Sequence, residues 1–467
     1  METKTTAIRE NHNHEIMRRW LTILTVEGSL ATVFITLTGG AFLTGLALML
    51  GANDFEIGLL AAIPFFAQVA QLFSAYLIDR TGRRKQITIW FSAIARQSWW
   101  LLVPILVFGG SWRLEAMIAI VIISNIAIMI ATVGWMSWVA DLVPDKIRGR
   151  YFGTRSAAVA LSTIVSTLAG GIILDQYGPI DLENTGFAIL IASACVFALA
   201  AVILLNRVPD PATRIAPPPV NLSYLFKPLK NKDFRQLTKV FIGWNLAIGI
   251  AAPFFAPHML NYLGMNFTMI SLYSAAAAVV AILLNKPWGK LIDRFGCKPV
   301  VVFCAFGISA IPLIWLFLNP GNRWILIPEV IYSAILWTGF NLAAFNIPIA
   351  NSPRGERTIY LAMFALLTGL AFFVASIIGG IIAQSLIDFT WMVGSQRIIN
   401  YQILFAVSSL LRMAAAGFFT TFHEPKEKRL PVMINFMGYS ILKWFSSGRQ
   451  IFPHPPHLDK SAASKTG

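Results

Sequence analysis

The sequence predicts an all-α membrane protein with twelve transmembrane helices, and its composition points there first. Of 467 residues, 56% are hydrophobic and 13% are charged, whereas a soluble domain carries roughly 25% charged residues. The mean hydropathy is +0.66. A water-soluble globule cannot bury so large an apolar fraction, because polar groups must cover its surface. We therefore expect lipid to surround most of the chain.

The apolar residues fall into blocks that are each long enough to cross a hydrocarbon core of ~30 Å as a helix. Barrel strands would alternate polar and apolar residues, and these blocks do not, so helices are expected. The long first block predicts a tilt or a break near Gly39-Gly40. The twelve predicted spans are 21–48, 56–78, 86–108, 114–140, 151–174, 186–206, 236–262, 267–291, 299–319, 324–350, 358–386 and 398–422.

The distribution of basic residues independently supports twelve spans. Of 37 Lys and Arg residues, 32 lie in the N-terminal tail, in or beside the loops after even-numbered spans, or in the C-terminal tail. The opposite side carries Arg113, Arg323 and Arg397, while Arg96 and Arg412 lie within spans. Basic residues stay in the cytoplasm during insertion. We expect a multi-pass protein of the cell membrane, the inner membrane in a bacterium, with both termini cytoplasmic.

The same distribution explains the net charge of +15. In a soluble chain this excess would suggest a nucleic-acid ligand, but here the basic residues lie on short loops that face anionic lipid. We therefore expect membrane lipid and no nucleic acid as a partner. The first span follows Arg18-Arg19 and lacks a small-residue cleavage pattern, so we expect it to be retained.

The sequence predicts no cofactor and no metal. Cys195, Cys297 and Cys304 have neither the spacing of metal ligands nor that of a disulfide framework. A nucleotide-binding loop of the G-x-x-x-x-G-K-[ST] kind is absent from the sequence, so ATP-driven transport is not expected. His258 is the only histidine within a predicted span, which argues against an enzyme embedded in the membrane.

A short charged phrase occurs twice in the sequence. LIDRTGRRK follows the second predicted span and LIDRFGCK follows the eighth, so that Asp79 and Gly82 correspond to Asp293 and Gly296 at an offset of 214. Another pair of loops matches at an offset of 209, and LGAN before the second span echoes LGMN before the eighth. Several weak matches at nearly one spacing predict a duplicated six-helix unit.

The duplication predicts four parts of the chain. Between the two bundles lies a Pro- and Lys-rich stretch that includes APPPV, which is typical of a linker. The C-terminal tail contains MINFMGYSILKWF, which either lies on the membrane surface as an amphipathic helix or is disordered. The parts are an N-terminal six-helix bundle with its cytoplasmic tail (1–206), a cytoplasmic linker (207–235), a C-terminal six-helix bundle (236–422) and a cytoplasmic tail (423–467).

The repeated phrase has a chemistry of its own. Asp79 follows the C-terminal end of a helix, where the dipole disfavours an acid unless a cation such as Arg83 or Arg84 compensates it. Gly82 permits the tight turn that returns the chain to the membrane, and Asp141 at the end of the fourth span is placed to join the cluster. Such a cluster can latch the two bundles together in one state and release them in another. The alternative is a solvated loop.

Together these features resemble the major facilitator superfamily of secondary transporters. The resemblance runs from about residue 15 to about residue 425 and rests on two six-helix halves, a long central loop and the doubled G-x-x-x-D-R-x-G-R-R type of signature. The leading glycine of the signature is Ala75 in the first copy and Gly289 in the second. The resemblance implies two bundles related by an axis along the membrane normal, a central cavity and alternating access by rocking.

Comparison with one branch of that family is less complete. Gly170-Gly171 and Gly379-Gly380 in the fifth and eleventh spans resemble the antiporter signature of the drug-efflux branch. The glycine-proline step of that signature is missing, and the fourth span lacks the arginine that the branch uses for proton coupling. A standard drug/proton exchanger is therefore disfavoured.

Charged residues inside spans are costly and thus candidates for function. Glu27 is predicted to be the only acid clearly within a span, and burial favours its protonated form, which suits a proton carrier. It could instead pair with Arg18 or Arg19. Arg96 and Arg412 require a carboxylate, free backbone carbonyls or an anionic substrate as a partner, although in the resembled fold their helices are peripheral.

Polar and aromatic side chains within the spans are candidates for the substrate path, with interhelical hydrogen bonding as the alternative role. In the resembled family the first, fourth, seventh and tenth helices line the cavity, which favours Asn125, Asn245 and Asn341. The candidates are Gln68, Gln71, Arg96, Asn125, Trp244, Asn245, Trp337 and Asn341.

From these features we expect a monomeric secondary active transporter of a small organic solute, coupled to protons or another ion, and no enzymatic activity. The few polar residues would suit sugars, amphipathic drugs or organic acids, and Arg96 favours an anion. One alternative is a protein of the same fold that transports nothing and acts as a membrane sensor or assembly scaffold. The other is a membrane enzyme acting on lipid-borne groups.

Overall fold

The computed structural model of the chain describes residues 2–144, 147–178, 182–210, 226–353, 356–394, 396–422, 424 and 428–447. Within these ranges, twelve helical segments are long and apolar enough to cross a membrane. The first runs over Met17–Met49 and the last over Asn400–Phe418. The twelve-helix membrane fold predicted from composition is therefore confirmed. Part of the predicted linker and the end of the C-terminal tail lie outside the described residues.

The N-terminal half supplies the first six spans. Three of them are divided into shorter helices. Its elements are α1 (Glu2–Leu37), α2 (Gly40–Met49), α3 (Asp54–Ala67), α4 (Ala70–Thr81), α5 (Arg84–Gln97), η1 (Ser98–Leu101), α6 (Leu102–Phe108), α7 (Arg113–Leu142), α8 (Arg148–Tyr177) and α9 (Glu183–Arg207).

The C-terminal half supplies the other six spans, a short hairpin and a final helix outside the bundle. Its elements are η3 (Lys227–Lys230), α11 (Lys232–Gly249), η4 (Ala252–Phe254), α12 (Phe255–Pro257), η5 (His258–Tyr262), α13 (Phe267–Phe295), α14 (Cys297–Leu316), η6 (Arg323–Ile325), α15 (Leu326–Ala350), α16 (Arg357–Ser385), β1 (Thr390–Val393), β2 (Gln396–Ile399), α17 (Asn400–Phe418) and α18 (Leu430–Ser447).

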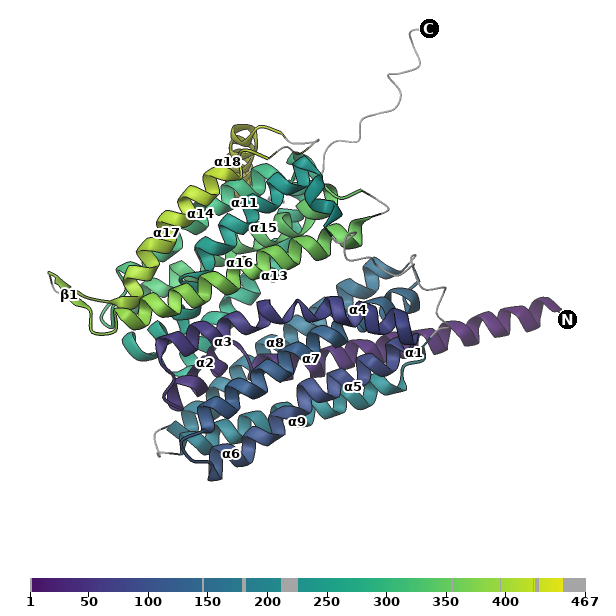
Figure 1. Cartoon of the computed structure of the whole chain (residues 1–467). Helices are drawn as coiled ribbons and strands as arrows, with labels where there is room; N and C mark the ends of the chain where they lie inside the picture. Colours follow the sequence, from purple (N-terminus) through teal and green to yellow (C-terminus); the bar gives the residue numbers. More distant parts are fainter. Residues whose placement is uncertain are drawn as a thin grey trace, which may run out of the picture.

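The helices form two groups, α1 to α9 and α11 to α17 (Figure 1). We call the end of the molecule that carries the start of α1 and α18 the termini end, and the end that carries the β1–β2 hairpin the far end. The groups approach each other toward the far end, where α3 packs on α16 and α8 packs on α13. Both pairings join helices that are far apart in the sequence, so they define the interface between the halves.

Small residues let the helices of the two halves approach closely. A Cβ atom at Gly58 in α3 would lie 2.6 Å from the carbonyl oxygen of Ser376 in α16. A Cβ atom at Gly171 in α8 would lie 2.8 Å from the carbonyl oxygen of Phe267 in α13. The backbones therefore touch at these glycines, which is how small residues promote helix contact where lipid removes the hydrophobic driving force.

Two of the divided spans in the N-terminal half are interrupted at short turns. The first span changes direction at Gly39, and Gly40 has a φ of 53°, which favours glycine. The break predicted near Gly39-Gly40 is thus confirmed. The second span is interrupted at Gln68-Val69, four residues after Pro64, by a turn that keeps helical dihedral angles but closes with i→i−3 hydrogen bonds.

The echo of LGAN and LGMN marks equivalent helix starts in the two halves. The side chain of Asn53 accepts a hydrogen bond from the Glu56 N–H at 2.9 Å, and that of Asn266 accepts one from the Met269 N–H at 2.9 Å. Each asparagine thereby satisfies a backbone donor that the first turn of its helix leaves free. The second and eighth spans therefore begin with the same cap, as a duplicated unit requires.

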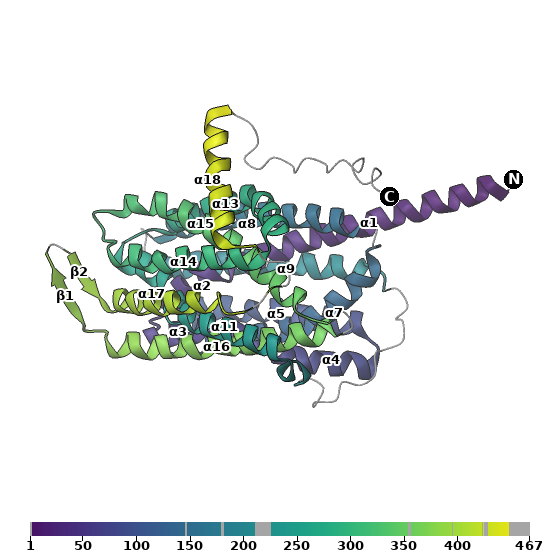
Figure 2. The same cartoon turned by 90° about the horizontal axis from the view of Figure 1, so that it is seen from above.

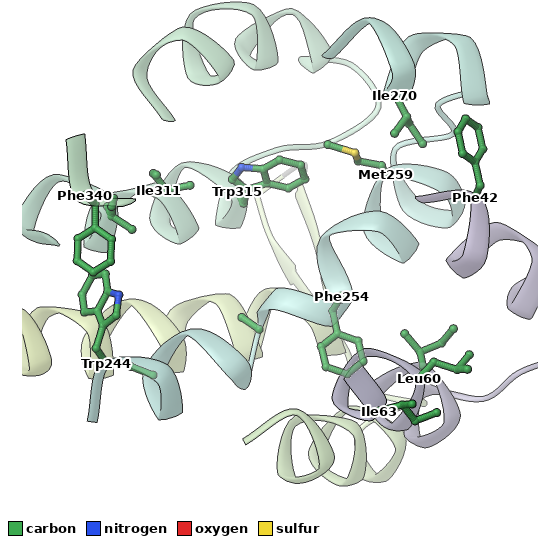
Figure 3. Close-up of a cluster of buried hydrophobic side chains, with 14 of the residues drawn as sticks. Phe42, Leu60, Ile63, Trp244, Phe254, Met259, Ile270, Ile311, Trp315 and Phe340 are labelled. Atoms are coloured by element: carbon green, nitrogen blue, oxygen red, sulfur yellow. The ribbon is translucent and has the colours of Figure 1, made fainter. Parts of the chain in front are cut away.

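The main apolar core is continuous across both halves. In the C-terminal half the ring of Trp244 stacks on that of Phe340, with centroids 4.9 Å apart. In Figure 3, Leu60 and Ile63 of α3 lie beside Phe254 of η4, so that the N-terminal half packs directly on the seventh span. Apolar contacts alone would leave the relative position of the halves loosely specified, and polar contacts at the far end supply that specificity.

Two elements extend beyond the bundle. β1 and β2 form an antiparallel hairpin in which Thr390 pairs with Ile399, and it marks the far end. At the termini end, α18 runs across the direction of the spans rather than along it (Figure 2). The sequence leaves two alternatives for this segment, an amphipathic helix on the membrane surface or a disordered tail, and residues 430–447 form a helix.

Candidate functional site

A cavity of about 750 Å³ lies between the two halves. Helices α1, α3, α5 and α7 wall it from one side, and the seventh and eighth spans wall it from the other. The wall is mostly apolar, with a few polar groups that can orient a solute. Those polar residues are Thr38, Thr44, Arg96, Ser124, Asn125, Thr132, Tyr273 and Ser274, and the aromatic residues Phe34, Trp99 and Phe255 complete the wall.

Arg96 brings a charge to this cavity, and Glu27 compensates it. The Nη2 atom of Arg96 lies 3.4 Å from Oε1 of Glu27, and both side chains are buried. The pair is incomplete, because the Nε of Arg96 and the Oε2 of Glu27 have no hydrogen-bond partner among the described residues. Arg96 reaches the cavity wall, although α5 packs mainly on α7 and α9 of its own half.

A second cation lies close to this pair. Arg155 of α8 stacks on Trp135, with its Cζ atom 4.7 Å from the ring centroid. Its guanidinium also lies against Gly28, where a Cβ atom would be 2.8 Å from Cζ. The absence of a side chain at Gly28 therefore lets Arg155 approach the helical turn that carries Glu27. The carboxylate of Glu27 is thus surrounded by positive charge from two helices.

The C-terminal half contains a buried carboxyl group that sequence reasoning did not identify. Glu329 in the first turn of α15 is 2% exposed, so Glu27 is not the only acid within a span. Its Oε2 accepts a hydrogen bond from the hydroxyl of Tyr273 at 2.7 Å, while its Oε1 has no partner among the described residues. Tyr273 also lines the central cavity, so one side chain separates Glu329 from the solute space.

Tyr273 borders a second hollow of about 560 Å³ between α13 and α15. This hollow contains two of the sequence-predicted path residues, Trp337 and Asn341, and also Asn285 of α13. The predicted i, i+4 spacing of Trp337 and Asn341 therefore places both on the side of α15 that faces α13. Asn125 lines the central cavity instead, where its Nδ2 donates to the Val121 carbonyl at 2.8 Å.

The cavity is closed at the far end by a buried carboxylate that joins the two halves. Asp54, in the first turn of α3, is 6% exposed. Its Oδ1 accepts a hydrogen bond from the hydroxyl of Tyr401 at 2.6 Å, and its Oδ2 accepts one from Nδ2 of Asn400 at 2.8 Å. Its backbone N–H donates to Oε1 of Gln384 at 3.0 Å. We call these four residues the far-end clamp.

A second acid bridges the halves beside the clamp. The carboxylate of Asp175 in α8 accepts hydrogen bonds from the N–H groups of Phe267 at 2.9 Å and Thr268 at 2.8 Å. These N–H groups belong to the first turn of α13, where the helix dipole favours a negative charge. Asp175 therefore caps a helix of the opposite half, and separation of the halves at the far end would expose that helix start.

At the termini end, the first signature copy forms bonds within its own half. Arg84 is 1% exposed and lies 2.5 Å from Oδ2 of Asp141 and 3.0 Å from Oδ1 of Asp210. Gly82 has a φ of 65° and ends α4 in the left-handed conformation that a tight turn requires. Arg83 is exposed. The described ion pairs of Arg84 tie the third, fourth and sixth spans together.

The second signature copy has an equivalent acid. The carboxylate of Glu424 accepts hydrogen bonds from the N–H groups of Cys297 at 3.1 Å and Lys298 at 2.7 Å, at the start of α14. Glu424 follows Asp210, and Lys298 follows Arg84, by the same 214 positions that separate the signatures. Each half thus uses an acid after its last span to hold its own signature loop.

The remaining predicted residues are distributed over both halves. The side chain of Asp79 lies outside the described residues, although its backbone belongs to α4. Asp293 is exposed at the end of α13, and Gly296 ends that helix with a φ of 93°. Gln68 lies against Gly369 of the opposite half, and Nε2 of Gln71 lies 3.3 Å from Sδ of Met129.

The central cavity is also not lined by Trp244, Asn245 or Arg412. Trp244 is 1% exposed within an aromatic cluster, so its size and burial serve the core. The Nδ2 of Asn245 donates to the Phe241 carbonyl of its own helix at 2.8 Å. Arg412 is buried, and its Nε has no hydrogen-bond partner among the described residues.

The family model of the Major Facilitator Superfamily matches residues 28–250 and again residues 240–436. The chain therefore belongs to the Major Facilitator Superfamily, a family of transporters. The two matches cover the two halves in turn, as the internal duplication predicts.

The chain is similar to an uncharacterized MFS-type transporter of Methanocaldococcus jannaschii. The two sequences are 22% identical over 366 residues, which cover 76% of this chain and 90% of that protein. It is also similar to the minor myo-inositol transporter IolF of Bacillus subtilis, with 30% identity over 233 residues that cover 45% of this chain and 49% of that protein.

Solved structures of transporters share the fold. A mutant of the nucleoside transporter NupG superposes with a TM-score of 0.66 at 14% identity, covering 87% of this chain and 100% of that one. The D-xylose-proton symporter superposes with a TM-score of 0.66 at 17% identity, covering 87% of this chain and 98% of that one. These likenesses support the two-bundle transporter fold.

Proposed function

We propose that this protein is a secondary active transporter that moves a small organic solute by alternating access. The observation that carries the proposal is the central cavity, which both halves wall and which Asp54 and Asp175 close at the far end. A cavity shared by two halves can change its accessible side when the halves rock. We further propose that the protein acts as a monomer and that the halves divide within 207–235.

We propose that both termini are cytoplasmic, so the far end faces outward and this conformation is closed to the outside. Cysteine labelling tests the orientation. Trp112→Cys and Leu182→Cys are expected to react with a membrane-impermeant maleimide in intact cells, whereas Ile215→Cys should react only after permeabilisation. The native cysteines are buried, so background labelling should be low. The opposite pattern would reverse the proposed topology.

We propose that proton coupling and solute binding meet at the pair of Glu27 and Arg96. When Oε1 of Glu27 takes a proton, the carboxyl group becomes neutral and the Arg96 guanidinium loses its counter-charge. An anionic group of the solute can then replace the carboxylate as the partner of the guanidinium. Proton and organic anion would thus bind together and cross together. Support comes from the incomplete pairing of Arg96 and its place in the cavity wall.

Transport itself is tested with purified protein. A library of sugars, nucleosides and organic acids is screened for thermal stabilisation at two pH values, because a ligand that binds only the folded state raises Tm. A stabilising solute is then offered to proteoliposomes with an imposed pH gradient. We expect accumulation that a protonophore abolishes. Binding without any movement would contradict the transporter and favour the sensor or scaffold.

A further inference from the structure

The last helix, α18, is attached to the second signature loop. The backbone N–H of Lys428 donates to the Phe295 carbonyl at 2.9 Å, just after Glu424 has capped the start of α14. Met433 in α18 is fully buried. These contacts fix the start of α18 against the loop between α13 and α14, which carries the repeated charged phrase.

The face of α18 that packs on the bundle is held by a cation as well as by apolar contact. The Cζ atom of Arg294, a residue of the second signature copy, lies 4.0 Å from the centroid of the Phe436 ring. The Phe436 ring in turn lies 5.3 Å from that of Phe295. An arginine over an aromatic face is attracted by the ring quadrupole. Movement of α18 would therefore be transmitted to the signature loop.

Another side of the same helix presents apolar side chains that are largely exposed. Val432 is 52% exposed and Tyr439 is 63% exposed. They are seven residues apart, so they share one side of the helix. Ile434, which is 43% exposed, lies about 200° of helical rotation away from Val432. We call the side with Val432 and Tyr439 the outer flank of α18.

The charge of this segment favours an anionic surface as the partner of the outer flank. From residue 428 to residue 458 the sequence carries four basic residues and no acid. They are Lys428, Arg429, Lys443 and Arg449. Basic residues beside a membrane are attracted to the anionic lipids of the cytoplasmic leaflet. A helix that runs across the spans at this end of the molecule has the direction that contact with a lipid surface requires.

We propose that α18 is an interfacial helix that rests on anionic lipid headgroups, with its outer flank in the headgroup region. Tyrosine is well suited to that position, because its ring is apolar and its hydroxyl is polar. The packed face binds the second signature loop while the outer flank binds lipid. The helix thereby ties the loop to the membrane surface, an assignment that rests on the proposed cytoplasmic position of the termini but not on the identity of the solute.

Site-directed spin labelling tests the proposal on the full-length protein. Val432→Cys, Tyr439→Cys and Ile434→Cys are labelled one at a time with a nitroxide, since the native cysteines are buried. Each variant is reconstituted into phosphatidylcholine vesicles with and without phosphatidylglycerol. We expect the labels at 432 and 439 to lose access to an aqueous nickel reagent several-fold when phosphatidylglycerol is present. The matched label at 434 should retain its access.

Two further measurements define the outcome. High salt should restore access at 432 and 439, because screening weakens attraction between surface charges, and Arg429→Gln should have the same direction of effect. Equal access at all three positions would overturn the interfacial placement. If the labels at 432 and 439 are equally protected from the nickel reagent with and without phosphatidylglycerol, the assignment of anionic lipid is overturned. A thermal unfolding curve for each variant, compared with that of the unsubstituted protein, confirms that the fold is intact.

Discussion

Glu27→Gln is expected to destabilise the protein strongly and to abolish transport driven by a pH gradient. The substitution leaves the Arg96 guanidinium buried with no counter-charge, since Glu27 is the residue to which its two terminal nitrogens bond. Removing one partner of a buried ion pair costs about 3–5 kcal/mol. The loss of stability is measured as a lower Tm of the purified protein. The loss of transport is measured as solute accumulation in proteoliposomes under an imposed pH gradient.

A double variant separates stability from coupling. Glu27→Gln combined with Arg96→Gln removes both charges, so most of the lost stability should return, while transport stays absent because the solute also loses Arg96 as its partner. The matched single variant is Glu329→Gln, which removes a buried acid that has no basic partner among the described residues. We expect Glu329→Gln to lower Tm less than Glu27→Gln does. If transport loses its pH dependence in Glu329→Gln but keeps it in Glu27→Gln, proton coupling lies in the C-terminal half. That result would contradict coupling at the pair of Glu27 and Arg96.

Asp54→Ala is expected to shift the protein toward a conformation that is open at the far end. The substitution removes the acceptor of the Tyr401 hydroxyl, and it removes one of the two acceptors of the Asn400 amide, which still donates to the Ala383 carbonyl at 2.9 Å. Each hydrogen bond to a charged group contributes about 1.5–3 kcal/mol. Loss of two such bonds corresponds to at least roughly a hundredfold change in the conformational equilibrium.

That shift is measured as the distance between two spin labels, one at Phe55→Cys and one at Ile387→Cys. Both positions are exposed at the far end. The distribution should move to longer distances in Asp54→Ala. Glu56→Ala is the matched control, because Glu56 lies in the same helical turn and its carboxylate accepts a hydrogen bond from the Asn53 N–H of its own half. An unchanged distribution in Asp54→Ala, or an equal change in Glu56→Ala, would show that the clamp does not hold the far end closed.

The number and placement of the spans could be predicted from the sequence, because length, hydropathy and basic residues each report on insertion independently. The break at Gly39-Gly40 was predictable for a similar local reason. The sequence also indicated that Arg96 needs a partner. It did not indicate that Glu27, separated from it by 69 positions, would be that partner, since pairing depends on how α1 packs on α5.

The residues that close the cavity were harder to predict. Asp54 follows an asparagine cap at the start of a span, where an acid is expected for the helix dipole alone. Its partners lie more than 300 positions away, and no local pattern connects them. Glu329 was overlooked although it lies within a predicted span, and an acid in the first turn of α15 is the signal that could have identified it. Trp244 shows the converse, because a large aromatic residue in a cavity-lining helix can face the core.

The interruption at Gln68-Val69 has a mechanical consequence. Before the interruption, α3 packs on α16 and carries Asp54 of the far-end clamp. After it, α4 leads directly into the first signature loop. A continuous helix would transmit any tilt of one segment rigidly to the other. The turn at Gln68-Val69 is tightened to i→i−3 hydrogen bonds, such as that from the Val69 N–H to the Phe66 carbonyl, and a tightened turn of this kind often marks a hinge. The first signature loop can therefore tilt with α4 while α3 stays packed on α16.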